Sequence, residues 1–387
     1  MASIWTPPAR FKANGSTTGG SLNMSQVGAF TDYLVDYLKY FKTQVGYDLH
    51  ALSPQNEPTI TTEYNSCDYQ PADLATVIKA LAPKLTSNNL PTKILYADDI
   101  FGAFPSFLGT CLSEVNKDAT AAAYPQILAG HYGGNEIASR GEYRSYGRAA
   151  FNTGKKAWNS EFGNGSDSWD GGAWDNVRNM YYMLSYNYSG IVYWLLGPHT
   201  NSGQAEESVM WSNTWGPKAR AIQPFARSIR PGARRVKTTC SNTNIYTLAF
   251  FHPEKENFTV MLINNTGSQQ SVSVTGNGIP STYTKYITSP SQNYVQSGTA
   301  QLNQGIDLPV KGIVALISAD GSYTGPTSEI DLRPAYTKSA LLAPAMSNRS
   351  FGIDGRRAGA RTSRGGVRLT LATDRNGASV ARTEIAW

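Results

Sequence analysis

Two glutamates at the ends of predicted β-strands carry the strongest chemical signal in the sequence. Glu57 lies in Ser-Pro-Gln-Asn-Glu-Pro, residues 53–58, directly after the strand-like run Leu49–Leu52, and Glu161 follows the run Lys156–Ser160. In a set of parallel βα units the carboxyl ends of the strands meet at one face, so both side chains would reach the same mouth. There one carboxyl group can protonate a leaving oxygen while the other attacks carbon.

The residues around the two glutamates suit the binding of a sugar. Asn56 offers donors and an acceptor for a sugar hydroxyl. Aromatic residues at predicted strand ends, or in the loop that follows, are Trp5, Tyr132, Trp158, Tyr193, Trp194, Trp169 and Trp174. Aromatic rings pack on the flat C–H faces of sugars and are typical of glycan clefts, although we expect Trp158 and Tyr193 to be core residues. His131 has no Ser or Cys nucleophile beside it, and we interpret it as a hydrogen-bonded structural residue.

No motif in the sequence indicates a cofactor. Glycine-rich stretches such as 163–165 match no phosphate-binding pattern, and the three cysteines, Cys67, Cys111 and Cys240, lack the spacing of metal ligands. We therefore predict neither a nucleotide nor a metal. Three thiols, or one disulfide and one thiol, are both compatible with the sequence.

The charge distribution argues against a nucleic-acid enzyme. The formal net charge is +6, but residues 331–387 hold ten basic and four acidic side chains, so the whole excess lies there and the body is neutral. A nucleic-acid enzyme would need a basic track through its site. We interpret the basic tail as a solvated extension; nucleic-acid binding through it would be salt-sensitive and lost on deleting 331–387.

Hydrophobic periodicity predicts an α/β architecture for residues 1–231. Helical segments are predicted in 25–45 and from near Pro71, Pro105, Gly141, Ala173 and Trp215. They alternate with β-rich runs at Ser3–Trp5, Leu49–Ser53, Lys93–Ala97, Ile127–His131, Lys156–Ser160 and Gly190–Leu195. Such alternation is typical of parallel βα units in a barrel or a doubly wound sheet.

The pattern changes twice after Pro231. Residues 232–320 show short alternating strands separated by turns rich in Asn, Gly, Ser and Pro, which predicts an antiparallel β-sandwich side domain. Residues 321–387 are rich in Arg, Gly and Ser, and we predict a mostly disordered tail. Its alternating run 366–372 could in principle cover the open edge of the parallel sheet, but the Arg density of the tail argues against insertion into a buried, apolar sheet.

Several features bear on localisation. No run of about 18 apolar residues is present, which argues against a membrane span. The first five residues lack the pattern of a signal peptide, whereas seven Asn-x-Ser/Thr triplets give modest support to secretion.

Several ordered motifs between residue 2 and about residue 320 resemble glycoside hydrolase family 30. Three of them are the Ser-x-Trp-x-Pro-Pro-Ala stretch 3–9, Gln-Asn-Glu-Pro at 55–58 and Trp-x-x-Glu at 158–161. The stretch 225–233 is similar to the family's last barrel helix where it enters the sandwich, and 287–291 resembles a sandwich turn of xylanase members.

The resemblance implies a (β/α)8 TIM-type barrel with a side β-sandwich. It further implies that Glu57 is the general acid/base and Glu161 the nucleophile, that Asn56 binds a sugar hydroxyl and that Tyr132 holds the nucleophile. Trp5 and Trp194 would line the subsite.

The chain also departs from the family pattern. It begins at the third barrel strand, so the barrel is N-terminally incomplete and lacks the second-strand Arg that supports the nucleophile in relatives. Leu195-Leu196-Gly197-Pro198 stands where bacterial glucuronoxylanases carry a glucuronate-binding Arg. Six strands would leave the sheet with two open edges. We therefore expect weak or absent activity from this chain.

The sequence thus predicts a secreted, monomeric, retaining β-glycanase of a cell-wall polysaccharide, with xylan preferred. β-1,6-Glucan, β-1,6-galactan and glucosylceramide are alternative substrates. An inactive glycan-binding or vestigial fragment is the alternative from another class, and turnover of an aryl β-glycoside would distinguish the two.

Overall fold

The computed structural model describes residues 1–100, 106–133, 136–163, 166–197, 208–211, 214–276, 278–323, 325, 366–373 and 379–386. The chain forms two compact units: unit 1 comprises Met1–Gly165 and Tyr182–Leu196, and unit 2 comprises Ser166–Tyr181 and Gly197–Trp387. This division differs from the boundary predicted at residue 231, because 166–181 and the helix at 217–228 pack with the C-terminal strands.

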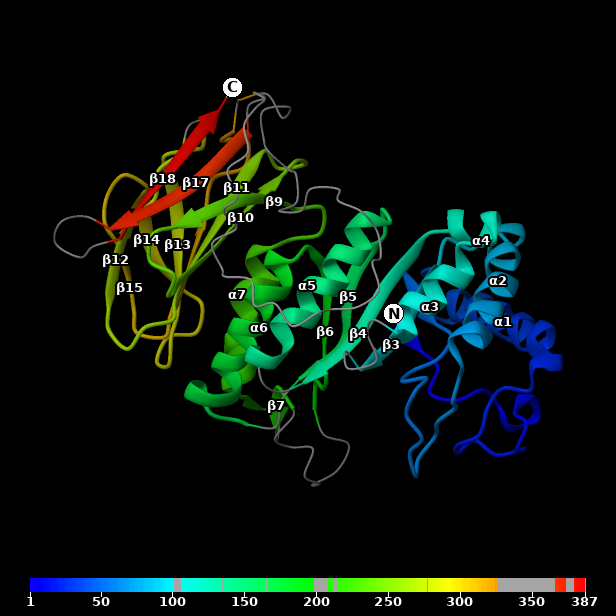
Figure 1. The fold of residues 1–387 in the computed structure, drawn as a ribbon. Coiled ribbons are helices and arrows are strands. Elements are labelled where there is room, and N and C mark those ends of the chain that lie inside the picture. The colour runs from blue at the N-terminus through cyan, green and yellow to red at the C-terminus, as the bar shows by residue number, and fades with distance from the viewer. Residues whose placement is uncertain are drawn as a thin grey trace. The chain divides into compact units, whose positions relative to one another are not determined.

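Unit 1 is built on a curled parallel sheet (Figure 1). Its strands are β1 (Ala2–Ser3), β2 (Ala51–Ser53), β3 (Lys93–Ile100), β4 (Gln126–Gly133), β5 (Lys156–Gly163) and β6 (Tyr188–Tyr193). Each strand pairs in parallel with the next one along the chain. In the described residues no pairing joins β1 to β6, so both remain edge strands. The predicted half-barrel of six parallel strands is therefore confirmed.

Helices connect these strands. They are α1 (Val27–Val45), α2 (Pro71–Ser87), α3 (Ser106–Val115), α4 (Ala119–Ala123), α5 (Glu136–Asn152) and α6 (Trp174–Ser185), the last shared between the units, with short 3-10 turns at Ala9–Phe11 and Met24–Gln26. The apolar stripe of α1 buries Phe30, Leu34 and Leu38. Gly46, in the left-handed region at φ 81°, ends α1 and donates its N–H to the Lys42 carbonyl.

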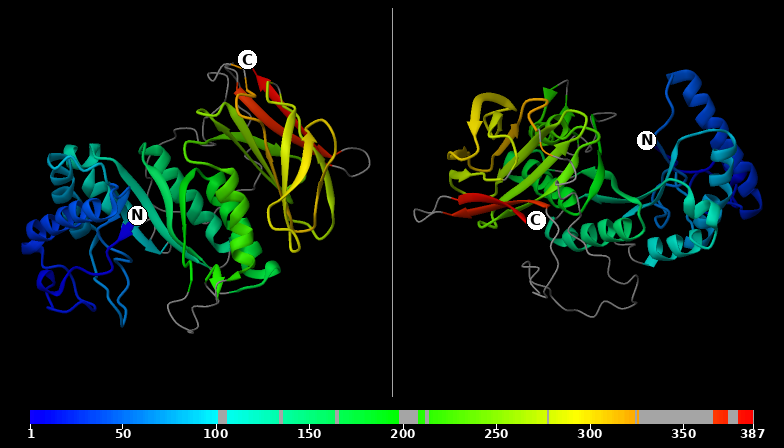
Figure 2. Two further views of the ribbon diagram at one scale, coloured as in Figure 1. Left: turned by 180° about the vertical axis from the view of Figure 1, so that it is seen from behind. Right: turned by 90° about the horizontal axis from the view of Figure 1, so that it is seen from above.

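Unit 2 contains the helix α7 (Pro217–Ser228), a π-helical turn at Trp169–Ala173 and a mainly antiparallel sheet (Figure 2). The sheet runs in the order β14-β13-β16-β11-β10-β9-β17-β18-β12-β15. Its strands are β9 (Arg234–Cys240), β10 (Ile245–His252), β11 (Asn257–Asn264), β12 (Gln270–Ser273), β13 (Thr282–Thr288), β14 (Val295–Gln301), β15 (Ile306–Leu308), β16 (Ile313–Ile317), β17 (Gly366–Thr373) and β18 (Ser379–Ala386). A separate two-stranded ribbon is formed by β7 (Met210–Trp211) and β8 (Thr214–Trp215).

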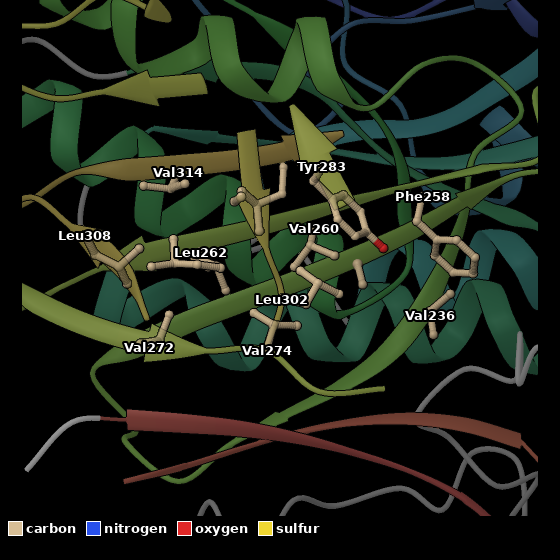
Figure 3. Packing of buried hydrophobic residues seen from close by; sticks show 14 of the residues in the cluster. Val236, Phe258, Val260, Leu262, Val272, Val274, Tyr283, Leu302, Leu308 and Val314 are labelled. Atoms are coloured by element: carbon tan, nitrogen blue, oxygen red, sulfur yellow. The ribbon is translucent and has the colours of Figure 1, made fainter. Parts of the chain in front are cut away.

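One apolar core holds the strands of unit 2 together. Val260 and Leu262 of β11 lie close to Val274 and Leu302 (Figure 3), and Tyr283 of β13 belongs to the same cluster. Strands from distant parts of the sheet thus share one core, which bears out the predicted β-sandwich in part.

Two strands lie inside the segment predicted to be disordered. β17 pairs in parallel with β9 and antiparallel with β18, which in turn pairs with β12. The alternating run 366–372 therefore does form a strand, but it joins the sheet of unit 2 and not the open edge of the parallel sheet. The alternating apolar residues Val367, Leu369 and Leu371 favour a strand, although the many Arg residues nearby favour disorder.

None of the helices in the described ranges is long and apolar enough to cross a membrane. All three cysteines are unpaired, with Cys67 and Cys111 buried.

Candidate active site

His131 on β4 lies at the centre of the candidate site. Ile127 and Ala129 precede it at two-residue spacing and belong to an apolar cluster with Leu95, so these side chains share one face of the sheet. The His131 side chain is 5% exposed. His131 therefore lies at the end of this buried face that is formed by the carboxyl ends of the strands.

Two irregularities in the strands turn carboxylates toward His131. Ala97 pairs with Ala129 and Asp99 with Gly130, so Asp98 is an extra residue in β3, with φ 58°. In β5 the pairing jumps over Ser160 in the same manner, and Glu161 becomes the partner of His131. Strict alternation would have put Ser160 on that face. Such bulges re-aim side chains next to functional sites.

The loop after β2 positions the first glutamate. The Asn56 N–H donates to the Ile4 carbonyl at 2.8 Å, and the Glu57 N–H donates to the Asp98 carbonyl at 2.8 Å. Glu57 adopts φ 46°, a conformation that few non-glycine residues take up. Backbone hydrogen bonds to two strands thus hold Glu57 in place.

Both predicted catalytic glutamates reach the same imidazole. His131 Nδ1 lies 3.2 Å from Glu57 Oε1 and 3.7 Å from Glu161 Oε2. One carboxylate oxygen of each glutamate and a nitrogen of His131 all lie within 4.8 Å of one another. The glutamate side chains are 18% and 28% exposed, so each keeps a part open to solvent.

Asp98 contacts the nitrogen of His131 that does not face the glutamates. Its side chain is fully buried, its Oδ1 lies 3.2 Å from His131 Nε2, and its Oδ2 accepts a hydrogen bond from Ser3 Oγ at 2.5 Å. Burial acts to raise the pKa of Asp98, but the hydrogen bond to His131, the positive charge of His131 and the hydrogen bond from Ser3 outweigh it and hold this pKa below its ordinary value.

The surrounding carboxylates determine the charge of His131. Burial acts to lower the pKa of His131, but the hydrogen bonds to Asp98 and Glu57, with the negative charges of Asp98 and Glu161, raise it to about 10. These contacts therefore favour the imidazolium form of His131 at neutral pH. Its neighbour Asp99 differs, because burial raises the pKa of that carboxyl.

The spacing of Glu57, His131 and Glu161 would also allow a shared metal ion. A metal ion there would have to displace a proton from His131, because a ligand nitrogen needs its lone pair. The 3.2 Å contacts of His131 with Glu57 and Asp98 fit a network of charged hydrogen bonds.

Trp5 and Trp194 form an aromatic pair next to Tyr64, a residue close enough to Glu57 and Glu161 to interact with their charges. The ring centroids of Trp5 and Trp194 are 5.8 Å apart, and Tyr64 lies 5.5 Å from Trp5. Trp5 follows β1 and Trp194 follows β6, so side chains from the carboxyl ends of the two edge strands meet here. A side chain on Gly163 would come within 2.4 Å of the Trp194 carbonyl, which explains the glycine at this close approach.

The other predicted site residues are placed as follows. Asn56 is buried, and its side-chain carbonyl lies 3.4 Å from Ser3 Oγ, within hydrogen-bond reach. Tyr132 lies on β4 opposite Phe162, but its side chain is outside the described residues.

Three tryptophans that the sequence associated with a cleft are packing residues. Trp158 packs on the cluster of the parallel sheet, against Gly190, as expected of a core residue. Trp169 and Trp174 are buried in unit 2, where their indole nitrogens donate to the Lys311 carbonyl and to Asn265. Their prediction as cleft residues was wrong, because the loop after β5 packs on the strands of unit 2.

Sequence reasoning missed Asp98 entirely and gave His131 only a structural role. A buried Asp-Asp pair at a strand end, residues 98–99, was the available signal. The role of His131 depends on two bulges, and alternation patterns do not contain them.

One family model matches the N-terminal part of the chain. Residues 2–103 match the family model described as O-Glycosyl hydrolase family 30. This match over the N-terminal part of the chain bears out the predicted resemblance to that family.

Solved structures share the fold. The chain is similar to the family 30 subfamily 8 xylanase Xyn30A from Clostridium acetobutylicum, with 24% identity, TM-score 0.67 and coverage of 82% of this chain and 79% of that one. A family 30 endoxylanase from Clostridium papyrosolvens gives 24% identity, TM-score 0.64 and coverage of 82% and 78%. The endo-β-1,6-glucanase BT3312 gives 21% identity, TM-score 0.64 and coverage of 82% and 71%.

Proposed function

We propose that the chain is a retaining glycoside hydrolase in which Glu57 is the general acid/base and Glu161 the nucleophile. The observation that carries this proposal is the approach of one oxygen of each carboxyl group to within 4.8 Å of the other. Retaining enzymes hold their two carboxyl groups about 5–5.5 Å apart, whereas inverting enzymes leave about 6.5–9.5 Å for a water molecule.

The reaction would proceed in two displacements. Glu161 attacks the anomeric carbon while the bond to the leaving oxygen breaks and Glu57 gives that oxygen its proton. Glu57 then removes a proton from water, which attacks the same carbon and releases Glu161. Each carboxyl group ends the cycle in the form in which it began.

We infer a β-linked cell-wall polysaccharide as substrate, with xylan first. Trp5 and Trp194 offer a ring pair that is proposed to line the subsite, and Asn56 and Tyr132 are proposed to contact the reacting sugar and the nucleophile. Similarity to xylanases favours xylan, while similarity to a β-1,6-glucanase keeps that linkage as the alternative, together with β-1,6-galactan and glucosylceramide. We further propose a secreted monomer with a β-sandwich side domain.

Hydrolysis of aryl β-xylosides by the purified protein tests this function. Glu57→Ala and Glu161→Ala should each lower kcat by at least about a hundredfold, because each removes a group that acts on the reacting bonds. Glu254→Ala, an exposed glutamate of unit 2, is the matched control and should leave kcat unchanged. Activity that survives either active-site change would contradict the proposal.

A glycan-binding protein without turnover is the second candidate function. The observation that favours it is the pair of open edges on β1 and β6, because exposed parallel edges weaken the frame that holds the glutamates. Retention on insoluble xylan, together with no release of aryl aglycone over hours, would favour this candidate.

A further inference from the structure

The contacts of His131 are unusual for a histidine beside two catalytic glutamates. Nδ1 faces Glu57 and Glu161 at 3.2 and 3.7 Å, and Nε2 faces Asp98 at 3.2 Å. A neutral imidazole can donate a hydrogen bond from only one of its nitrogens. Carboxyl oxygens on both sides of the ring favour a proton on each nitrogen, so this geometry stabilises the imidazolium form of His131.

The ring cannot turn away from these partners. His131 is 5% exposed, and Asp98 behind it is fully buried and also accepts from Ser3 Oγ at 2.5 Å. Carboxylate partners of this kind fix the orientation of an imidazole. The positive charge is thus held at a defined point between the glutamates.

We propose that His131, oriented by Asp98, is a positioning residue whose permanent positive charge holds the carboxyl groups of Glu57 and Glu161 together and sets the pH range in which the pair works. This inference rests on the proposed function. Two carboxyl groups this close repel each other when both are ionised, and a cation beside both offsets that repulsion. The positive charge of His131 stabilises the ionised nucleophile, but His131 forms no bond to the substrate.

The charged and titratable groups facing His131 come from several elements. They are Glu57 after β2, Asp98 and Asp99 on β3 and Glu161 on β5, with Tyr146 of α5 close to the two aspartates and Tyr64 close to the two glutamates. The pKa values of Tyr64 and Tyr146 are raised, mainly because burial disfavours their anions. His131 is thus the cation in this described set, and the carboxyl groups are the anions.

The double variant His131→Gln with Asp98→Asn tests the proposal through catalysis. Removing His131 alone would leave Asp98 as an uncompensated buried charge, and that variant could fail to fold. The double variant removes both charges and keeps hydrogen-bonding side chains at both positions. Cooperative thermal unfolding serves as the check that it folds.

The expected result is a displaced pH profile. Without the nearby cation both glutamates bind protons more readily, so both limbs of the kcat/KM profile should move upward by about one pH unit. A residue that only packs would change the height of the profile and leave its limbs in place. A folded double variant whose limbs coincide with those of the wild type would overturn the proposal.

A nitrogen NMR measurement tests the charge without reference to activity. The chain has four histidines, and with ¹⁵N-histidine labelling the resonances lost in the double variant assign His131. We expect both ring nitrogens of His131 to remain protonated at pH 7.5, whereas a midpoint near the ordinary value of about 6.5 would overturn the proposal. If the wild type cleaves no glycoside, the proposed function fails, while this measurement still decides the charge of His131.

Discussion

Replacing Asp98 by Asn should destabilise unit 1 strongly and in a pH-dependent manner. The substitution keeps the size of the side chain and an oxygen for Ser3, but it removes the negative charge 3.2 Å from His131 Nε2. At that distance and an effective dielectric constant of about 20, the lost attraction is about 5 kcal/mol. Since removing one partner of a buried ion pair typically costs about 3–5 kcal/mol, we expect a loss in this range.

The pH dependence follows from the two pKa shifts. Asp98 has a lowered pKa, so its contribution to stability is present above pH 3.8 and is lost as the pH falls below that value. His131 has a raised pKa, so its contribution is full below pH 6.5 and is lost as the pH rises towards about 10. The cost of Asp98→Asn should therefore be largest near pH 5.5 and much smaller near pH 9.5.

Urea unfolding at these two pH values, followed by tryptophan fluorescence, measures the effect. Asp99→Asn is a matched control, because Asp99 is equally buried and adjacent, but burial raises its pKa. Removing that disfavoured charge should cost about 1 kcal/mol or less. The reasoning is refuted if Asp98→Asn costs no more than Asp99→Asn at pH 5.5, or if its cost is the same at both pH values.

Two further predictions concern packing and binding. Gly190→Ala should lower the free energy of unfolding by about 1–3 kcal/mol in a denaturation assay, because the new methyl group would lie within 2.6 Å of the Trp158 ring. Gly109→Ala is the control: its methyl group would meet nothing within 4 Å, so this change should be neutral or stabilising in the same assay. Trp5→Ala should raise KM about tenfold with little change in kcat, because it removes a ring that pairs with Trp194 and that we propose stacks on bound sugar. An unchanged KM in steady-state kinetics would show that this ring does not contact the substrate.

Much of the parallel sheet could be predicted because its signals are local. Runs such as Lys93–Ala97 and Lys156–Ser160 combine β-forming residues with clear flanking turns, and the helix 27–45 shows its apolar stripe in the sequence. The two glutamate motifs ended predicted strands, so topology alone placed Glu57 and Glu161 at one mouth.

The remaining features depend on longer-range structure. The extra residues Asp98 and Ser160 shift the strand pairing by one position, and no periodicity reveals such a shift before the neighbouring strand is known. In unit 2 the polar edge strand β14, at Val295–Gln301, has mostly exposed or half-buried side chains and therefore no hydrophobic alternation. The prediction of Trp169 as a cleft residue was wrong because its partner Lys311 is 142 positions away in the sequence, and local patterns do not reveal such a contact.

Azide rescue of Glu161→Ala, with an aryl β-glycoside bearing a reactive leaving group, tests the central claim most directly. A small anion can occupy the space of the missing carboxylate while Glu57 remains in place, so azide should restore part of the lost rate and form the α-glycosyl azide, identified by ¹H NMR. Wild-type activity in Glu161→Ala without azide, or a β-glycosyl azide as the product, would contradict the assignment of Glu161 as the nucleophile.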